Sequence, residues 1–246
     1  SGIVASKLPC GYIDANGLRH TDYVVREMTG EEEDLLAGKG DVLKRLNQVI
    51  LNCLQSLGEI DDRQILKIAV SQLTAVDRML LLISIRRASL GNDYNMYYVC
   101  PSCTKKSRFS VNLSELEVKE MPNPEQRSFE TTLSTGKVVH WHCMTGKDEN
   151  WLQGMTKKSN SDLLTLALLC RVDKVGEDEL VRRNMTQSIA VLKKLTMRER
   201  NQLRNLFKVE EGSVDTEIEL ECPHCGHESK GELDVGQTDF FFPSEI

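Results

Sequence analysis

Two Cys-Pro-x-Cys motifs, 122 residues apart (222 − 100), place the tightest constraint on how this chain can fold. Each motif supplies two thiolates, whereas a closed structural zinc site needs four ligands. Two residues between the cysteines allow a tight turn that directs both sulfur atoms at one ion, and the proline after the first cysteine favours that turn. We therefore predict that Cys100, Cys103, Cys222 and Cys225 bind one structural zinc ion per chain.

The two motifs end a longer pattern that occurs twice in the same order. The matched segments are Met28-Thr29-Gly30 with Met144-Thr145-Gly146, an apolar segment around Cys53 with one around Cys170, and Leu73-Thr74-x-x-Asp77-Arg78 with Leu195-Thr196-x-x-Glu199-Arg200. The distance between matched residues grows only from 116 (144 − 28) to 122 along the chain. Such self-similarity indicates an internal duplication. The predicted fold is therefore α+β, with two similar halves joined at a shared, zinc-ribbon-like site of four cysteines.

Each predicted half consists of a β-hairpin, capped helices and a hairpin that carries the cysteine motif. Four threonines stand three residues before an acidic residue, which is the pattern of a helix N-cap with its returning carboxylate. These threonines are Thr29, Thr74, Thr145 and Thr196. Apolar periodicity predicts helices over residues 41–58, 75–90, 161–171, 177–194 and 197–208. Prolines at 122 and 124 predict a linker, so the halves should span residues 1–121 and 122–246.

Composition and charge argue against several classes of partner. The formal net charge is −6, whereas proteins that hold nucleic acid by phosphate contacts usually show a basic surface. No apolar run approaches the roughly 18–20 residues that span a bilayer. The N-terminal residues show no charged segment followed by an apolar core, so we expect no secretion. Cysteine pairs in such a chain favour metal binding over disulfides, and neither nucleic acid nor a membrane is an expected partner.

Other arrangements of the cysteines stay open at this stage. His224 and His227 lie close to Cys222 and Cys225, although four ligands within six residues would strain a tetrahedral site. A thioredoxin-like redox pair lacks its usual βαβ surroundings. Two disulfides, or reduced thiols without a metal, are the remaining alternatives.

The sequence does not predict an enzyme. Four thiolates leave no open position for water, so the predicted site is structural rather than catalytic, and we expect no catalytic residue and no small-molecule substrate. The chain contains no glycine-rich phosphate loop, Gly-x-Ser-x-Gly or His-Glu-x-x-His motif. Cys53 and Cys170 lie on apolar helical faces and are predicted to be core thiols. The alternative is an enzyme that uses an exposed Cys143, or His140 and His142, which share one face of a predicted strand.

A run of aromatic residues near the C-terminus predicts a contact surface. Half of the chain's six phenylalanines are consecutive, at Phe240, Phe241 and Phe242. Three adjacent phenylalanines are costly to leave in water, because each buried aromatic side chain contributes on the order of 1.5–3 kcal/mol. They either dock on this protein or insert into a neighbouring subunit, and we predict that they contribute to partner binding.

Several of these segments resemble one protein family. They are Leu8-Pro9, Met28-Thr29-Gly30 with its acidic helix start, Asp77-Arg78 leading to Arg86-Arg87-Ala88-Ser89-Leu90-Gly91, and Tyr98-Val99-Cys100-Pro101-Ser102-Cys103. They resemble the T4-type baseplate hub proteins, also called baseplate hub assembly chaperones, of contractile-tailed phages. The resemblance is best before about residue 120, and the second cysteine motif and the aromatic run fit it too.

The resemblance implies a structural or assembly protein of the tail baseplate, made in the bacterial host cytoplasm and located in the virion. It implies that the chain binds other baseplate or tail proteins near the hub, and it supplies no catalytic residues. The residues leave one alternative from another class, a zinc-ribbon adaptor subunit of a nucleic-acid-processing complex. The net charge of −6 predicts that the salt-sensitive polyanion binding of such an adaptor is absent.

Overall fold

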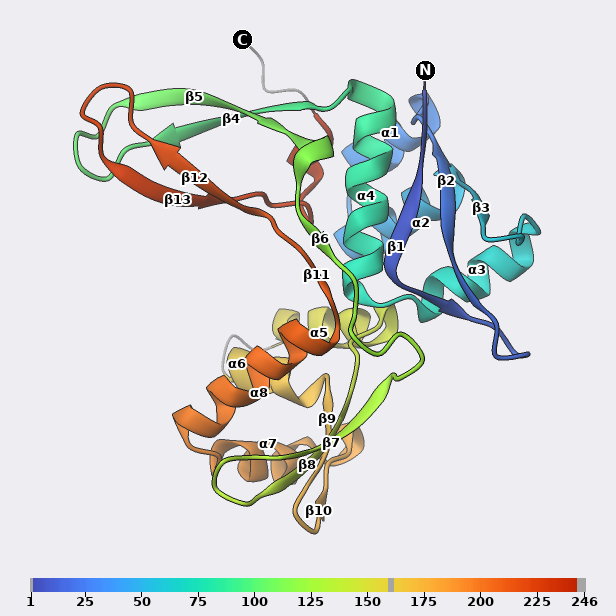
Figure 1. Cartoon of the computed structure of the whole chain (residues 1–246), viewed down its shortest axis with the longest axis vertical. Helices are drawn as coiled ribbons and strands as arrows, with labels where there is room; N and C mark the ends of the chain where they lie inside the picture. The colour runs from blue at the N-terminus through green and yellow to red at the C-terminus, as the bar shows by residue number, and fades with distance from the viewer. Residues whose placement is uncertain (1, 159–161, 243–246) are drawn as a thin grey trace.

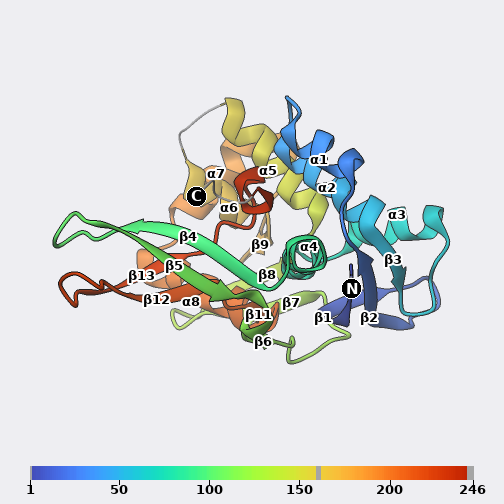
Figure 2. The ribbon, with the colours of Figure 1, turned by 90° about the horizontal axis from the view of Figure 1, so that it is seen from above.

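The computed structural model describes residues 2–158 and 162–242 of the chain (Figure 1). The fold is mixed α+β, and its helices accompany small antiparallel sheets. Two parts are built from successive stretches of sequence, and two long hairpins project together to one side of them (Figures 1 and 2). No described helix is long and apolar enough to cross a membrane.

The first part surrounds a hairpin of strands β1 (Ile3–Ile13) and β2 (Arg19–Arg26). The chain reverses at Gly17, whose φ of 80° lies in the left-handed region that glycine adopts without strain. A third strand, β3 (Leu54–Leu57), pairs with β2 and gives the order β1-β2-β3. The helices of this part are α1 (Gly30–Ala37), α2 (Val42–Cys53), α3 (Arg63–Gln72) and α4 (Ala75–Leu90).

The second part has an antiparallel sheet in the order β10-β9-β8-β7. Its strands are β7 (Ser128–Thr132), β8 (Val138–His142), β9 (Val172–Val175) and β10 (Asp178–Glu179). Its helices are α5 (Gly146–Lys158), α6 (Leu163–Leu169), α7 (Met185–Lys193) and α8 (Met197–Glu210). Both parts begin with a hairpin, two helices and a strand that joins the hairpin, and both end with two further helices. The second part adds β10 and a 3-10 turn before its last two helices.

The two projecting hairpins, called the arms below, end in the cysteine motifs. One arm is β4 (Asp93–Val99) with β5 (Lys106–Asn112), and the other is β12 (Glu217–Glu221) with β13 (Glu228–Glu232). The hydroxyl groups of Tyr98 and Ser229 lie 2.5 Å apart and join the two arms. At the base of the arms, β6 (Val118–Lys119) pairs antiparallel with β11 (Ser213–Val214), so the two connections to the second part run side by side (Figure 1).

The threonine caps set where the helices begin. Thr29, Thr74 and Thr196 cap α1, α4 and α8, as predicted, by accepting hydrogen bonds from N–H groups of the first helical turn. Thr145 precedes α5, and its own backbone N–H donates to Asp148 at 2.9 Å. These bonds satisfy polar groups that a helix terminus leaves unpaired, and they therefore fix the start of each helix.

The helix predicted over residues 41–58 is wrong at its C-terminal end. Helix α2 stops at Cys53, and the next four residues form β3 beside β2. Leu54 and Leu57 are fully buried in this strand. Pairing with the open edge of β2 therefore outweighs the helical spacing of the leucines, because strand preference is decided by packing rather than by local propensity.

The helix predicted over residues 177–194 is wrong over its first turns. The left-handed residue Gly176 (φ 58°) folds the chain back, so that β10 pairs with β9. A short 3-10 turn (Arg182–Asn184) follows, and α7 begins only at Met185. The remaining predicted helices correspond to α4, α6 and α8.

The core of the first part contains side chains from both sides of the predicted boundary between residues 121 and 122. Helix α4 lies within this core and is buried on all sides over residues 80–86. The side chains from beyond the boundary are Val214, Leu233, Val235, Phe240 and Phe241. A separate core fills the second part around Trp141, which packs against Phe129 and Phe207. Residues 233–241 thus complete the core of the first part rather than that of the second.

The aromatic run docks on the chain itself. Phe240 and Phe241 are 1% and 3% exposed, and Phe242 is partly buried against the same core. The Phe240 ring lies 5.1 Å from that of Tyr94, and the Phe240 carbonyl accepts a hydrogen bond from Arg86 Nε at 3.2 Å. Of the two predicted alternatives, this arrangement is docking within the chain. Phe240 and Phe241 offer no surface to a partner here, because their side chains are part of the core.

Candidate metal centre

The tips of the arms bring the four predicted ligand cysteines together. Every pair of their Sγ atoms lies within 4.8 Å. The Sγ atoms of Cys100 and Cys225 are 3.7 Å apart, and those of Cys103 and Cys222 are 3.6 Å apart. The first contact joins the first cysteine of one motif to the last cysteine of the other, and the second contact does the same with the two motifs exchanged. The cluster therefore has the approximate twofold symmetry of a site to which each arm contributes equally.

These distances fit a tetrahedral metal site. Four sulfur atoms at about 2.3 Å from a tetrahedral zinc ion would lie about 3.8 Å from one another. A disulfide needs an S–S distance of about 2.05 Å, so the arrangement does not fit two disulfides. Burial opposes ionisation of Cys222, but the backbone N–H groups of His224 and Cys225 outweigh it and lower the pKa of Cys222 to about 7. At Cys225 the N–H of His227 favours the thiolate, but burial and the neighbouring thiols outweigh it and raise the pKa to about 11. A metal binds the thiolate form, so it would displace the protons that the cluster keeps.

The two cysteine turns make the same backbone hydrogen bonds. The N–H of Thr104 donates to the carbonyl of Cys100 at 2.9 Å, and the N–H of Gly226 donates to the carbonyl of Cys222 at 2.8 Å. Both donors have a left-handed backbone, with φ of 61° at Thr104 and 72° at Gly226. The turns thus direct two sulfur atoms of each arm toward one point, and a closed set of four thiolates leaves no coordination position for a substrate or for water.

The histidines near the second motif do not belong to the cluster. His224 and His227 are exposed. Among residues 2–158 and 162–242, the four cysteines are the one group of at least three possible ligands close enough together to hold an ion. His140 lies on β8, where its Nε2 is 3.5 Å from the Glu130 carboxylate. The structure therefore does not support a local Cys/His site or a second metal site on that strand.

The thiols outside the cluster are not activated. Cys143, the candidate nucleophile, is 2% exposed rather than exposed, and burial raises the pKa of its thiol to about 12. Cys10 is fully buried in a small apolar cluster with Cys143 and Met121, and burial raises the pKa of its thiol as well. Cys53 and Cys170 are buried core thiols, as predicted, with pKa values raised by burial to about 12 and about 11. A reactive thiol has a lowered pKa, so none of these four is a catalytic candidate.

His142 belongs to a charged cluster at the start of α5. Its Nδ1 lies 2.9 Å from the Asp173 carboxylate, and its Nε2 lies 3.2 Å from Asp148 Oδ2. Arg182 also bonds to Asp148, and its guanidinium lies 4.6 Å from the centre of the Trp151 ring. The bonds to Asp148 and then to Asp173 raise the pKa of His142 to about 9. These opposite charges pair with one another and hold the hairpin of β7 and β8 against α5. The cluster therefore has a structural role.

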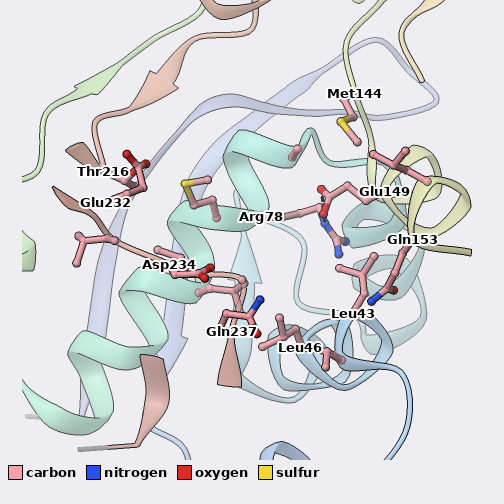
Figure 3. Close-up of a pocket in the computed structure, with 18 of the residues that line it drawn as sticks. Leu43, Leu46, Arg78, Met144, Glu149, Gln153, Thr216, Glu232, Asp234 and Gln237 are labelled. Atoms are coloured by element: carbon pink, nitrogen blue, oxygen red, sulfur yellow. Dashed lines mark hydrogen bonds and ion pairs between the residues drawn. The ribbon is translucent and has the colours of Figure 1, made fainter. Parts of the chain in front are cut away.

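A cavity of about 950 Å³ lies where the first part, the second part and the segment after β13 meet (Figure 3). Its walls come from α2, α4, α5 and residues 232–237. Arg78 on α4 and Glu149 on α5 both line it. Sequence spacing gave no sign of Glu149 or of the cavity. Gly146 permits the close contact between the two parts, because a Cβ atom there would lie 2.7 Å from Arg78 Nη1.

Fold and site together define a class of protein, an α+β protein whose two arms meet in a cluster of four cysteines that could hold a metal ion. The described residues outside that site include no activated thiol. Residues 13–242 match the family model described as T4 bacteriophage base plate protein, and the chain belongs to this family. The family membership confirms the predicted resemblance and implies that the partners are other baseplate proteins. No curated protein and no solved structure gives a significant match.

Proposed function

We propose that this chain is a structural or assembly protein of the hub region of a contractile phage-tail baseplate, and that it acts by binding other baseplate proteins. The family match over residues 13–242 carries the proposal. The closed cysteine site and the buried thiols of raised pKa support a binding role rather than catalysis. The proposal includes synthesis in the host cytoplasm and a place in the tail baseplate of the virion.

One structural zinc ion per chain is part of this proposal, bound by Cys100, Cys103, Cys222 and Cys225. Sγ separations of 3.6 and 3.7 Å and an all-thiolate ligand set support zinc. The ion would hold the tips of the two arms together. Its binding free energy, on the order of 10–16 kcal/mol in small zinc domains, would contribute directly to folding stability.

The proposal also treats the two parts as copies of one unit, spanning residues 1–121 and 122–246. The shared order of elements and the matching hydrogen bonds of the two cysteine turns support it. The test is an experimental structure, in which residues 10–118 should superimpose on residues 127–235. The duplication fails if the threonines that begin helices in one half lie in strands in the other.

Affinity purification from infected cells tests the function. A tagged chain should co-purify with proteins of the baseplate hub, and disruption of its gene should leave tails without complete baseplates. Cys222→Ser should reduce co-purification, because the arms lose their shared ion. A protein that is isolated alone from every extract of infected cells contradicts the proposal. Salt-sensitive binding to DNA or RNA would instead favour the nucleic-acid adaptor.

A further inference from the structure

The cavity between the two parts has the character of a binding site for another polypeptide. We propose that it binds an extended segment of a neighbouring baseplate protein, which places an apolar side chain in the cavity and a Lys or Arg side chain at its rim. The inference rests on the proposed function, because it states how a partner is held. The volume of about 950 Å³ is at the upper end of the range for ligand sites, roughly 300–1,000 Å³.

Three buried polar atoms among the described residues that line the cavity lack hydrogen-bond partners. The Arg78 side chain is 5% exposed, and its Nε lies 3.6 Å from Glu149 Oε1, which is beyond hydrogen-bond distance. Among the described residues neither atom has a hydrogen-bond partner, and neither does Oε1 of Gln153 (Figure 3). Buried polar groups are normally paired, because an unpaired one destabilises the fold. Arg78 and Glu149 compensate each other's charge as an ion pair, but these atoms make no hydrogen bond, so a shift of the side chains would present one donor and two acceptors to an incoming molecule.

A peptide backbone matches this set of groups better than a simple anion does. A carbonyl oxygen of the segment can accept from Arg78, and a backbone N–H can donate to Glu149 or Gln153. An anion would be attracted to Arg78 but repelled by the carboxylate of Glu149, 3.6 Å away. An extended backbone presents N–H donors and carbonyl acceptors in alternation, so it can pair with the guanidinium and with the acceptor oxygens at once.

The walls and the rim specify the side chains of the segment. The apolar walls include Val42, Leu43, Leu46, Met79, Leu82 and Leu152. Glu232 and Asp234 are exposed on the opposite side from Arg78 in the view of Figure 3. Together with Glu149, they make three carboxylates to one guanidinium among the charged lining residues. The apolar walls favour a large apolar side chain, and the excess of negative charge favours a basic residue beside it.

A random peptide library displayed on filamentous phage, selected against the full-length metal-loaded chain, tests this proposal. We expect the enriched peptides to combine a large apolar residue with Lys or Arg. Fluorescence anisotropy with a labelled synthetic copy of an enriched peptide then gives its affinity. Asp234→Lys and Leu43→Trp should each weaken binding by about tenfold or more. Glu179→Lys changes another exposed acid, on β10 and outside the cavity; this matched control should bind like the unmodified chain.

Each other outcome overturns the proposal. Enrichment of acidic peptides, no enrichment at all, or equal affinity for the Asp234→Lys chain would show that the cavity does not take a basic segment. Self-association that Asp234→Lys abolishes would assign the cavity to a second copy of this chain. Asp234 is exposed, so this variant should fold even if Leu43→Trp does not. If no peptide binds but the chain still co-purifies with baseplate proteins, only this inference is wrong. If peptides bind but the chain does not co-purify with baseplate proteins, the proposed function is wrong.

Discussion

Arg26 and His142 make the same contact in the two parts of the molecule: each ends the second strand of its hairpin and bonds the carboxylate at the start of the following helix. Arg26 donates to both oxygens of Glu32 at 3.1 Å, and His142 Nε2 lies 3.2 Å from Asp148 Oδ2. The spacing of 116 residues that relates the repeated motifs also relates these pairs (142 − 26 and 148 − 32). Above the acidic range in which the carboxylates titrate, the contact depends on pH in the second part alone, because an arginine stays protonated and a histidine does not.

We predict that His142 makes the stability of the protein depend on pH. Its pKa is raised from 6.5 to about 9, so its contribution is fully present below pH 6.5 and is lost as the pH rises through about 9. The free energy of unfolding, measured by urea titration, should fall by on the order of 2 kcal/mol over this range. His142→Arg should remove this dependence and keep the contact. His140→Gln is the control and should leave the dependence unchanged, whereas an unchanged dependence in His142→Gln would contradict the prediction.

We predict one zinc ion per chain, measured by elemental analysis of the purified protein. Cys100→Ser and Cys222→Ser should each abolish zinc binding and lower the melting temperature, because three ligands cannot close the site. Cys53→Ala removes a core thiol outside the cluster and should keep one zinc per chain. Two ions per chain, or none with four free thiols, would rule out a shared site.

We predict different effects of the same substitution at two matched glycines, Gly30 and Gly146. A Cβ atom at Gly30 meets no described atom within 4 Å, whereas one at Gly146 would lie 2.7 Å from Arg78 Nη1. Gly30→Ala should leave the free energy of unfolding unchanged or raise it by up to about 1 kcal/mol. Gly146→Ala should lower it by about 1–3 kcal/mol, because the buried guanidinium must move. Equal effects in urea titrations would show that the two parts do not meet closely at Arg78.

We predict that the aromatic run stabilises the isolated protein. Phe240→Ala should lower the free energy of unfolding by about 3–5 kcal/mol, because it removes a ring from a filled core. Tyr97→Ala on the exposed face of an arm is the control, and a surface change of this kind should cost less than about 1 kcal/mol. If thermal and urea denaturation show no loss of stability for Phe240→Ala, the aromatic run does not belong to the core. It would then be a candidate contact surface for a partner.

The clustering of the four cysteines was the part of the molecule most open to sequence reasoning. Each pair of cysteines is set by the short spacing within Cys100-Pro101-Ser102-Cys103 and its second copy, and the repeat supplies the reason for bringing the two pairs together. The caps at Thr29, Thr74 and Thr196 were predictable for the same reason, since a cap and its helix are neighbours in sequence. Features fixed within a few residues of chain are therefore those that the sequence predicted correctly.

Features set by distant partners were not predictable. Leu54 and Leu57 continue the helical spacing of α2, and only the edge of β2 converts them into a strand. The aromatic run is equally apolar whether it meets this chain or another, so its sequence could not decide between the two. The cavity depends on how α4 and α5 approach each other, which no local pattern encodes.

The place of residues 233–241 in the core of the first part has a consequence for synthesis on the ribosome. Domains usually fold in order as they emerge, with the N-terminal one first. Here Phe240 and Phe241 fill space beside α4, so the first part leaves the ribosome with a gap in its interior. The second part, whose core lies within residues 129–207, has its own core residues available earlier than the first part does. During translation the second part should therefore complete its core before the first part does, although the first part is synthesised first. Until then, the first part is the region that a chaperone has most reason to protect.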